Sequence, residues 1–131
     1  MISTALENLH NSYAPYSHYN VSAACLMSSG KIYRGVNVES ALLSCTICAE
    51  RNAIFTAVAE GDRKLEAIAI VGGLNYATEE YCTPCGVCRQ VMRDFCVSTD
   101  MPIICAKSPD DYKVWTLAEM LPESFGPETL E

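Results

Sequence analysis

The chain has 131 residues, a formal net charge of −7 and eight cysteines, and half of its residues are hydrophobic. This length predicts a single domain, residues 1–131, with a core that needs no disulfides. Apolar stretches such as residues 67–71 are far too short to cross a bilayer, and the acidic balance argues against a nucleic acid partner. Because residues 1–12 lack the pattern of a secretion signal, we expect an intracellular, cytoplasmic protein whose cysteines are buried or bind metal.

Hydrophobic periodicity predicts alternating helices and strands in the order α-β-β-α-β-α-β-β-α. In chain order these elements cover residues 2–12, 21–27, 31–38, 48–60, 65–71, a helix from about 85, and residues 102–106, 112–116 and 117–121. The first two strands flank Ser28-Ser29-Gly30, which is typical of a hairpin turn. Thr83 is expected to cap the helix near residue 85, with Pro84 just inside it. This order favours an α/β fold with one central mixed sheet between helices.

Two cysteine motifs carry the functional signal. They are Cys48-Ala49-Glu50 and Pro84-Cys85-Gly86-Val87-Cys88. Both fall at expected helix starts, where free N–H groups stabilise a thiolate, and the spacing of Cys85 and Cys88 places them on one helical turn. Three thiolates can hold one Zn²⁺ and leave a fourth position for water. Glu50, near the metal but not bound to it, is suited to proton transfer.

Other interpretations of these cysteines remain open from the residues alone. Cys45 adds a second C-x₂-C pair, which could form a closed structural zinc site, and Cys82 gives a C-x₂-C-x₂-C run like that of iron–sulfur proteins. Glu50 and Pro84 favour the catalytic interpretation, because neither alternative needs them. Since three thiolates make the zinc complex anionic, Arg51, with Arg89 after the second motif, is expected beside the ligands.

The motifs resemble the signature of the zinc-dependent nucleoside and nucleobase deaminases, and the chain is most similar to the small homotetrameric cytidine deaminases. The matching segments are Tyr13–Ser17, Asn37–Glu39, residues 48–55, residues 85–90, and Leu121-Pro122 with Phe125. The resemblance covers nearly the whole chain. It implies a three-layer sandwich with a central five-stranded mixed sheet.

The resemblance also implies a reaction and its metal. One Zn²⁺ per chain is held by Cys48, Cys85 and Cys88, and Glu50 moves the protons. The implied activity is hydrolytic deamination of cytidine and 2′-deoxycytidine to uridine and 2′-deoxyuridine, with release of ammonia, in pyrimidine salvage. The partner is a small nucleoside, without nucleic acid polymer or membrane.

Further residues are expected around the nucleoside by the same resemblance. Asn37 and Glu39 match the residues that bind the sugar hydroxyls, and Tyr19 stands where a phenylalanine usually lies against the base or sugar. The backbone N–H of Ala49 is expected to contact the pyrimidine carbonyl. Phe125 matches an aromatic side chain that crosses a subunit interface, which implies a homotetramer with active sites completed by neighbouring subunits.

Some residues near the expected pocket depart from the family pattern. Tyr19 replaces phenylalanine, Ser40 stands where asparagine is usual, Leu43 stands where an aromatic residue is frequent, and residues 72–81 form a longer connection. These departures leave the metal chemistry intact but bear on the substrate. Two alternatives therefore remain: a deaminase of a modified cytosine nucleoside such as blasticidin S, and a catalytically silent zinc-binding assembly protein on the same fold.

Overall fold

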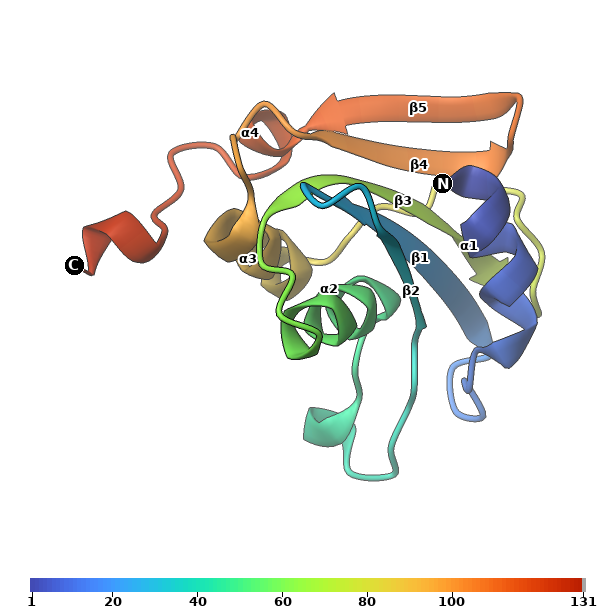
Figure 1. Ribbon diagram of the computed structural model, residues 1–131. Helices are drawn as coiled ribbons and strands as arrows, with labels where there is room; N and C mark the ends of the chain where they lie inside the picture. The colour runs from blue at the N-terminus through green and yellow to red at the C-terminus, as the bar shows by residue number, and fades with distance from the viewer. Residues whose placement is uncertain (131) are drawn as a thin grey trace.

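The computed structural model describes residues 1–130. The helices are α1 (Ile2–Asn8), α2 (Ala49–Ala59), α3 (Gly86–Phe95) and α4 (Leu117–Met120), and the strands are β1 (Tyr19–Met27), β2 (Ile32–Val36), β3 (Leu65–Leu74), β4 (Pro102–Ser108) and β5 (Asp111–Thr116). Short 3₁₀ helices lie at η1 (Leu9–Asn11), η2 (Leu43–Cys45) and η3 (Pro127–Thr129). The predicted order of helices and strands is confirmed (Figure 1).

The strands form one five-stranded sheet in the order β2-β1-β3-β4-β5. The hairpin of β1 and β2 is antiparallel, as is the pairing of β1 with β3 and of β4 with β5. Only β3 and β4 pair in parallel, with Ile68 opposite Ile103. A parallel pair needs a crossover connection, and α3 lies in the segment between these two strands. The prediction of a mixed five-stranded sheet is confirmed.

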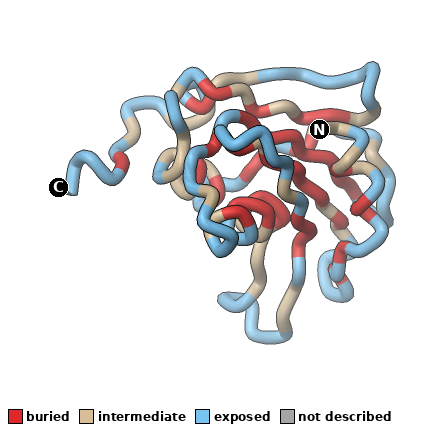
Figure 2. Tube along the Cα trace, in the orientation of Figure 1, coloured by how far each residue is buried: buried red, intermediate tan, exposed pale blue. Residues whose placement is uncertain are grey.

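Helices cover both faces of the sheet, which makes three layers (Figure 1). On one face, Ala5 of α1 packs on Ala24, Val71 and Ala106, and all four are fully buried. On the other face, α2 and α3 cover the larger part of the core, in which Cys25 and Cys105 are also fully buried. Figure 2 shows the buried residues concentrated along the central strands and the inner sides of these helices. Burial of this apolar surface is the main force that holds the layers together.

Some boundaries differ from the prediction. The first helix ends at Asn8 and its last turn is the 3₁₀ helix η1, and β3 extends to Leu74. The prediction that Thr83 caps α3 and that Pro84 lies within it is wrong, because Cys85 is the N-cap residue. Its sulfur accepts a hydrogen bond from the backbone N–H of Cys88 over 3.5 Å. The sulfur thus takes the role that a threonine hydroxyl has at other helix starts.

The approach of α2 to the sheet depends on a glycine. Gly35 of β2 faces α2 so closely that a Cβ atom there would lie 2.4 Å from the backbone nitrogen of Ala53. Asn52 of α2 also donates a hydrogen bond over 3.0 Å to the carbonyl of Val36. These contacts fix the start of α2, and with it Cys48. Within residues 1–130, no helix has the length and apolar character needed to span a membrane.

Candidate metal centre and substrate cavity

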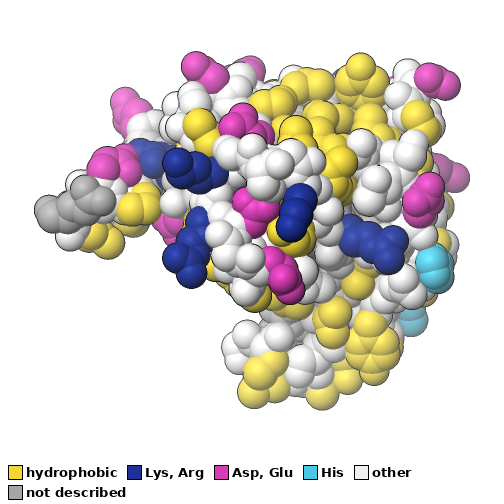
Figure 3. All heavy atoms as spheres, in the orientation of Figure 1, with side chains coloured by type: hydrophobic (Ala, Val, Ile, Leu, Met, Phe, Trp, Pro, Cys, Tyr) yellow, Lys and Arg dark blue, Asp and Glu magenta, His cyan; other side chains and the backbone are white. Residues whose placement is uncertain are grey.

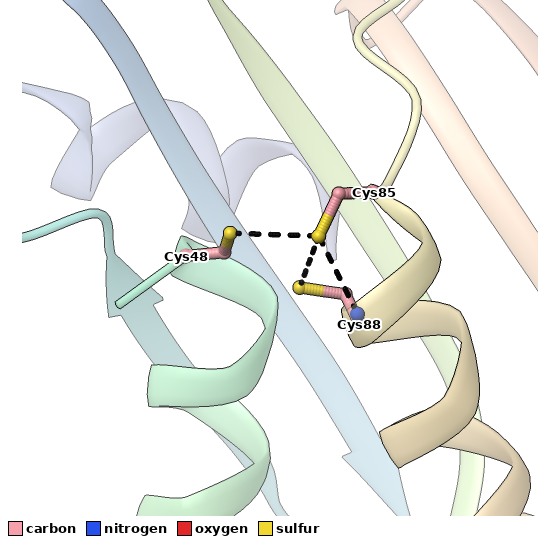
Figure 4. A group of neighbouring side chains, drawn as sticks. All are labelled: Cys48, Cys85 and Cys88. Atoms are coloured by element: carbon pink, nitrogen blue, oxygen red, sulfur yellow. Dashed lines mark hydrogen bonds between the residues drawn. The ribbon is translucent and has the colours of Figure 1, made fainter. Parts of the chain in front are cut away.

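Three cysteine sulfur atoms meet where α2 and α3 begin (Figure 4). Cys48 is the N-cap of α2, Cys85 is the N-cap of α3, and Cys88 lies in the first turn of α3. The Sγ atoms of Cys48 and Cys85 are 3.7 Å apart, and those of Cys85 and Cys88 are 3.5 Å apart. All three sulfur atoms lie within 4.8 Å of one another. Two helix N-termini thus direct their positive ends at one cluster of thiols.

This spacing fits a tetrahedral zinc ion. At a Zn–S distance of about 2.3 Å, sulfur ligands at tetrahedral corners are about 3.8 Å apart, close to the separations in the cluster. Among the described residues, no other Cys, His, Asp or Glu side chain belongs to the group, so Cys45 and Cys82 lie outside it. The cluster therefore offers three protein ligands and leaves a fourth position open, as catalytic zinc sites do.

The charge of the cluster is offset by a neighbouring cation. Arg51, in the first turn of α2, donates a hydrogen bond from Nη2 to the sulfur of Cys48 over 3.3 Å. Hydrogen bonds from the Cys88 thiol and from Arg51 lower the pKa of the Cys48 thiol well below its ordinary value. The sulfur is thus stabilised as a thiolate, the form that binds metal. Arg51 thus lies beside Cys48, one of the three cysteines of the cluster.

Glu50 lies beside this cluster in the first turn of α2. The residue is only 4% exposed, and burial raises the pKa of its carboxyl group to about 7. It also lines the cavity that opens beside Cys48 and Cys85. A buried carboxyl group next to a metal position can accept a proton there and give it back, because neither of its charge states is strongly preferred.

The cavity gathers most of the residues that the sequence singled out. Tyr19, Asn37, Glu39 and Ala49 line it together with Glu50. The sequence did not assign the other lining residues to a substrate cavity, namely Ser17, Val21, Thr46, Ile47, Cys82 and Thr83. Ser17 belongs to the segment Tyr13–Ser17, which matches the deaminase family. This match is the sequence feature that could have indicated Ser17 as a lining residue. Cys82 and Thr83 were noted only for a cysteine run and a helix cap, and Val21, Thr46 and Ile47 have no distinctive sequence pattern.

Glu39 is held in place by a turn that precedes β1. Its Oε1 atom accepts hydrogen bonds from the backbone N–H groups of Tyr16 and Ser17, at 3.0 and 3.1 Å, and its Oε2 atom accepts one from the Ser17 hydroxyl. Partial burial opposes the charge, but these hydrogen bonds outweigh it and lower the pKa of Glu39 below its ordinary value. Glu39 therefore contributes a carboxylate in a fixed position to the lining of the cavity.

Phe125 lies away from this cavity. It is 58% exposed and is not among the lining residues of its own chain's cavity. The segment around it is nevertheless anchored to α3, since Gln90 donates a hydrogen bond over 3.0 Å to the Phe125 carbonyl. Arg93 of the same helix donates to the Ser124 hydroxyl over 2.9 Å and pairs with Glu128. The aromatic ring is thus presented outward on a fixed backbone.

Comparisons with known proteins agree with this geometry. Residues 1–103 match the family model described as the cytidine and deoxycytidylate deaminase zinc-binding region. A cytidine deaminase of Sporosarcina psychrophila is 39% identical over 130 residues, which cover 99% of this chain and 92% of that protein. A cytidine deaminase of Halalkalibacterium halodurans is 38% identical, with 99% and 95% of the two chains covered.

Solved structures are similar as well. The crystal structure of cytidine deaminase from Burkholderia pseudomallei has a TM-score of 0.83 and 36% sequence identity, and the match covers 95% of each chain. The structure of cytidine deaminase from Mycobacterium leprae has a TM-score of 0.77 and 33% identity, with 94% of this chain and 95% of that chain covered. The predicted resemblance is confirmed, and the chain belongs to the cytidine and deoxycytidylate deaminase family.

Proposed function

We propose that this chain, acting as a single domain over residues 1–131, is a zinc-dependent enzyme that hydrolyses cytidine and 2′-deoxycytidine to uridine and 2′-deoxyuridine with release of ammonia. The observation that carries the proposal is the buried carboxyl group of Glu50 beside an open three-sulfur site, both facing one cavity. A purely structural zinc site uses four protein ligands and needs no carboxyl group of this kind.

The reaction replaces the C4–N bond of cytosine by a C4–O bond, with water as the source of oxygen. Cys48, Cys85 and Cys88 would hold the zinc ion, which would act as a Lewis acid and make a water molecule more acidic. The Glu50 carboxylate accepts a proton from the attacking water and delivers it to N3 of the ring. Glu50 then passes the second proton to the amino group, which leaves as ammonia. No oxidant or further reactant is needed.

The remaining residues of the cavity orient the nucleoside. Asn37 and Glu39 supply an amide and a carboxylate for the sugar hydroxyls, which need partners when they are buried. Tyr19 also lines the cavity, and its ring is suited to packing against the base or sugar. Ala49 is the first residue of α2, so its N–H has no acceptor in a preceding turn and is free for the pyrimidine carbonyl.

A homotetramer in which neighbouring subunits complete the cavity forms part of the same proposal. Its support is exposed apolar surface at two places in the chain. Leu42 and Leu43, at the start of η2, are 64% and 78% exposed. Hydrophobic side chains gather at the end of the molecule where this loop lies (Figure 3). Phe125 near the C-terminus is likewise exposed. Large apolar side chains in such number favour a subunit interface.

A spectrophotometric screen tests the proposed activity. Purified protein loaded with zinc is given cytidine, 2′-deoxycytidine, blasticidin S and adenosine in separate assays, with Glu50→Gln as the matched inactive control. We expect turnover of cytidine and 2′-deoxycytidine. In Glu50→Gln we expect kcat to fall about 10²-fold to 10⁴-fold, with the zinc content unchanged. Turnover of blasticidin S alone would support the modified-nucleoside alternative. Absence of turnover with every substrate would support a silent zinc protein.

A further inference from the structure

A chain of buried polar side chains leads from the connection between β3 and α3 to the substrate cavity. Its members are Asn20, Ser12 and Asn37, which are 3%, 6% and 8% exposed. They come from separate parts of the sequence, and only Asn37 lines the cavity. Buried polar groups must be satisfied by hydrogen bonds, so the direction of each bond in this chain can be worked out from its ends.

The first end is fixed by a backbone group. Asn75 and Tyr76 both have left-handed φ angles, 51° and 66°, and this turn directs the backbone N–H of Tyr76 at the Oδ1 atom of Asn20 over 3.2 Å. A backbone N–H can only donate, so the amide orientation of Asn20 is set. Its Nδ2 group therefore donates to the hydroxyl oxygen of Ser12, which lies 3.1 Å away.

The direction of the hydrogen bonds at Ser12 follows from the number of protons that a hydroxyl group can donate. Ser12 has a single proton to donate. Because its oxygen already accepts from Asn20, that proton is free for the Oδ1 atom of Asn37, with which the Ser12 hydroxyl makes a short hydrogen bond. The bonds thus all run in one direction, from Tyr76 through Asn20 and Ser12 to Asn37.

The second end is fixed independently by two backbone groups. The N–H of Val21 donates over 3.0 Å to the Oδ1 atom of Asn37, and the Nδ2 atom of Asn37 donates over 2.8 Å to the carbonyl of Tyr19. With Ser12 as the second donor, both lone pairs of Oδ1 are used. One N–H of Nδ2 is the only hydrogen-bonding capacity that Asn37 has left for a ligand.

We propose that Ser12 and Asn20 are positioning residues that make Asn37 a hydrogen-bond donor only, so that the substrate group beside it must be an acceptor. Glu39 supplies the opposite function, because its fixed carboxylate can only accept. A donor and an acceptor that line the same cavity match a hydroxyl group, which accepts with its oxygen and donates its one proton. The inference rests on the proposed nucleoside substrate and assigns the selection of a sugar hydroxyl to residues outside the cavity.

The test compares two substrates in one variant. Ser12→Ala removes the proton donated to Asn37 and leaves Asn20 without an acceptor. We expect KM for cytidine to rise about tenfold, the size of one lost hydrogen bond, with kcat and zinc content unchanged. For 2′,3′-dideoxycytidine, which lacks the 2′- and 3′-hydroxyls of the sugar, we expect KM to be the same in the variant and the parent protein.

Another buried serine of the protein provides a matched control variant. Ser22→Ala also removes a buried serine hydroxyl, in this case one from β1. The Ser22 hydroxyl has no hydrogen-bond partner within residues 1–130, so KM for both substrates should be the same as in the parent protein. Asn20→Asp is a second test variant of the same shape. It turns the donor to Ser12 into an acceptor, draws the Ser12 proton away from Asn37, and is expected to raise KM for cytidine only.

Two outcomes would overturn the inference while leaving the proposed function intact. One is an equal loss of activity on cytidine and the dideoxynucleoside, which marks a merely structural role. The other is an unchanged KM in both variants. If neither variant folds, a crystal structure of the unmodified protein with uridine decides the question: the sugar hydroxyl should contact the amide atom of Asn37 that also contacts the Tyr19 carbonyl, and contact with the other amide atom contradicts the inference. Failure of the proposed function itself would appear as an unmodified protein that does not deaminate cytidine.

Discussion

The guanidinium group of Arg89 joins the start of α3 to the end of α4, since its Nη1 atom donates a hydrogen bond over 2.8 Å to the backbone carbonyl of Met120. Its Nε atom donates over 2.8 Å to the carbonyl of Pro84, the residue before the metal-site cysteine Cys85. A planar guanidinium can hold two carbonyl groups in fixed directions. Arg89 therefore couples the loop that carries Cys85 to the C-terminal part of the fold.

This coupling predicts the effect of Arg89→Lys. A lysine keeps the positive charge but cannot reach both carbonyl groups with one planar group. We expect the free energy of unfolding to fall by about 2 kcal/mol, as for the loss of a hydrogen bond from a charged donor. Chemical denaturation measures it. Arg63→Lys, at an exposed position between α2 and β3, is the control and should leave the stability within about 0.5 kcal/mol. Equal stability of the two variants would show that the paired contacts contribute little.

The three-sulfur site predicts a pattern of zinc contents. Cys48→Ala, Cys85→Ala and Cys88→Ala each remove one of the sulfur atoms in the cluster, so these variants should purify with little zinc. Cys45→Ala and Cys82→Ala should keep about one zinc per chain, because neither sulfur belongs to the cluster. Elemental analysis of the five purified variants gives the result directly. Loss of zinc in Cys45→Ala would instead point to a closed site with four cysteine ligands.

The sequence predicts the elements well where periodicity is strong, and the start of α3 shows where it does not suffice. Thr83 followed by Pro84 has the pattern of an N-cap and a first helical residue. The helix begins later because Cys85 itself accepts the N–H of Cys88. A thiol rarely appears in rules for helix caps, so the local pattern favoured the wrong residue.

The directional chain from Asn20 to Asn37 was out of reach of sequence patterns. Ser12 and Asn37 are separated by 25 residues and Asn20 and Tyr76 by 56, so no local spacing connects them. Cysteine motifs and a neighbouring carboxylate can be found from sequence because metal ligation requires particular residue types at short spacing. Serine and asparagine have many other uses in loops and strand ends, and only the folded sheet shows that these three touch.

The close approach of β2 to α2 predicts that Gly35→Ala is destabilising. A Cβ atom there would meet backbone atoms of α2, including the Ala49 carbonyl oxygen at 2.8 Å, and backbone cannot move aside as a flexible side chain can. Overpacking of this kind is expected to lower the free energy of unfolding by about 1–3 kcal/mol. Thermal or chemical unfolding checks this. Gly86→Ala is the control, since no atom lies within 4 Å of the added Cβ, and it should not destabilise the fold. Equal stability of Gly35→Ala and the parent protein would mean that α2 shifts freely.

The exposed ring of Phe125 predicts that subunits of two different variants restore each other's activity in a mixed oligomer. If Phe125 completes the cavity of a neighbouring subunit, as the proposed tetramer requires, Phe125→Ala lowers activity although no group of its own chain's cavity changes. Glu50→Gln lowers activity by removing the proton carrier. When the two inactive variants are unfolded together and refolded as a mixture, some cavities receive Glu50 from one chain and Phe125 from the other, so activity should return.

The refolded mixture distinguishes a Phe125 ring that acts in a neighbouring subunit from one that acts within its own chain. If Phe125 acts within its own chain, every cavity in a mixed oligomer lacks either the carboxylate or the ring, and refolding restores nothing. Each variant refolded alone is the control for recovery of folded protein and zinc. Because Gln90 and Arg93 hold the backbone on which the ring is presented, a Gln90→Ala chain mixed with Glu50→Gln should also recover activity, through the intact tails of the Glu50→Gln subunits. Recovery with Phe125→Ala but not with Gln90→Ala would show that the Gln90 contact serves folding and not the placement of the ring.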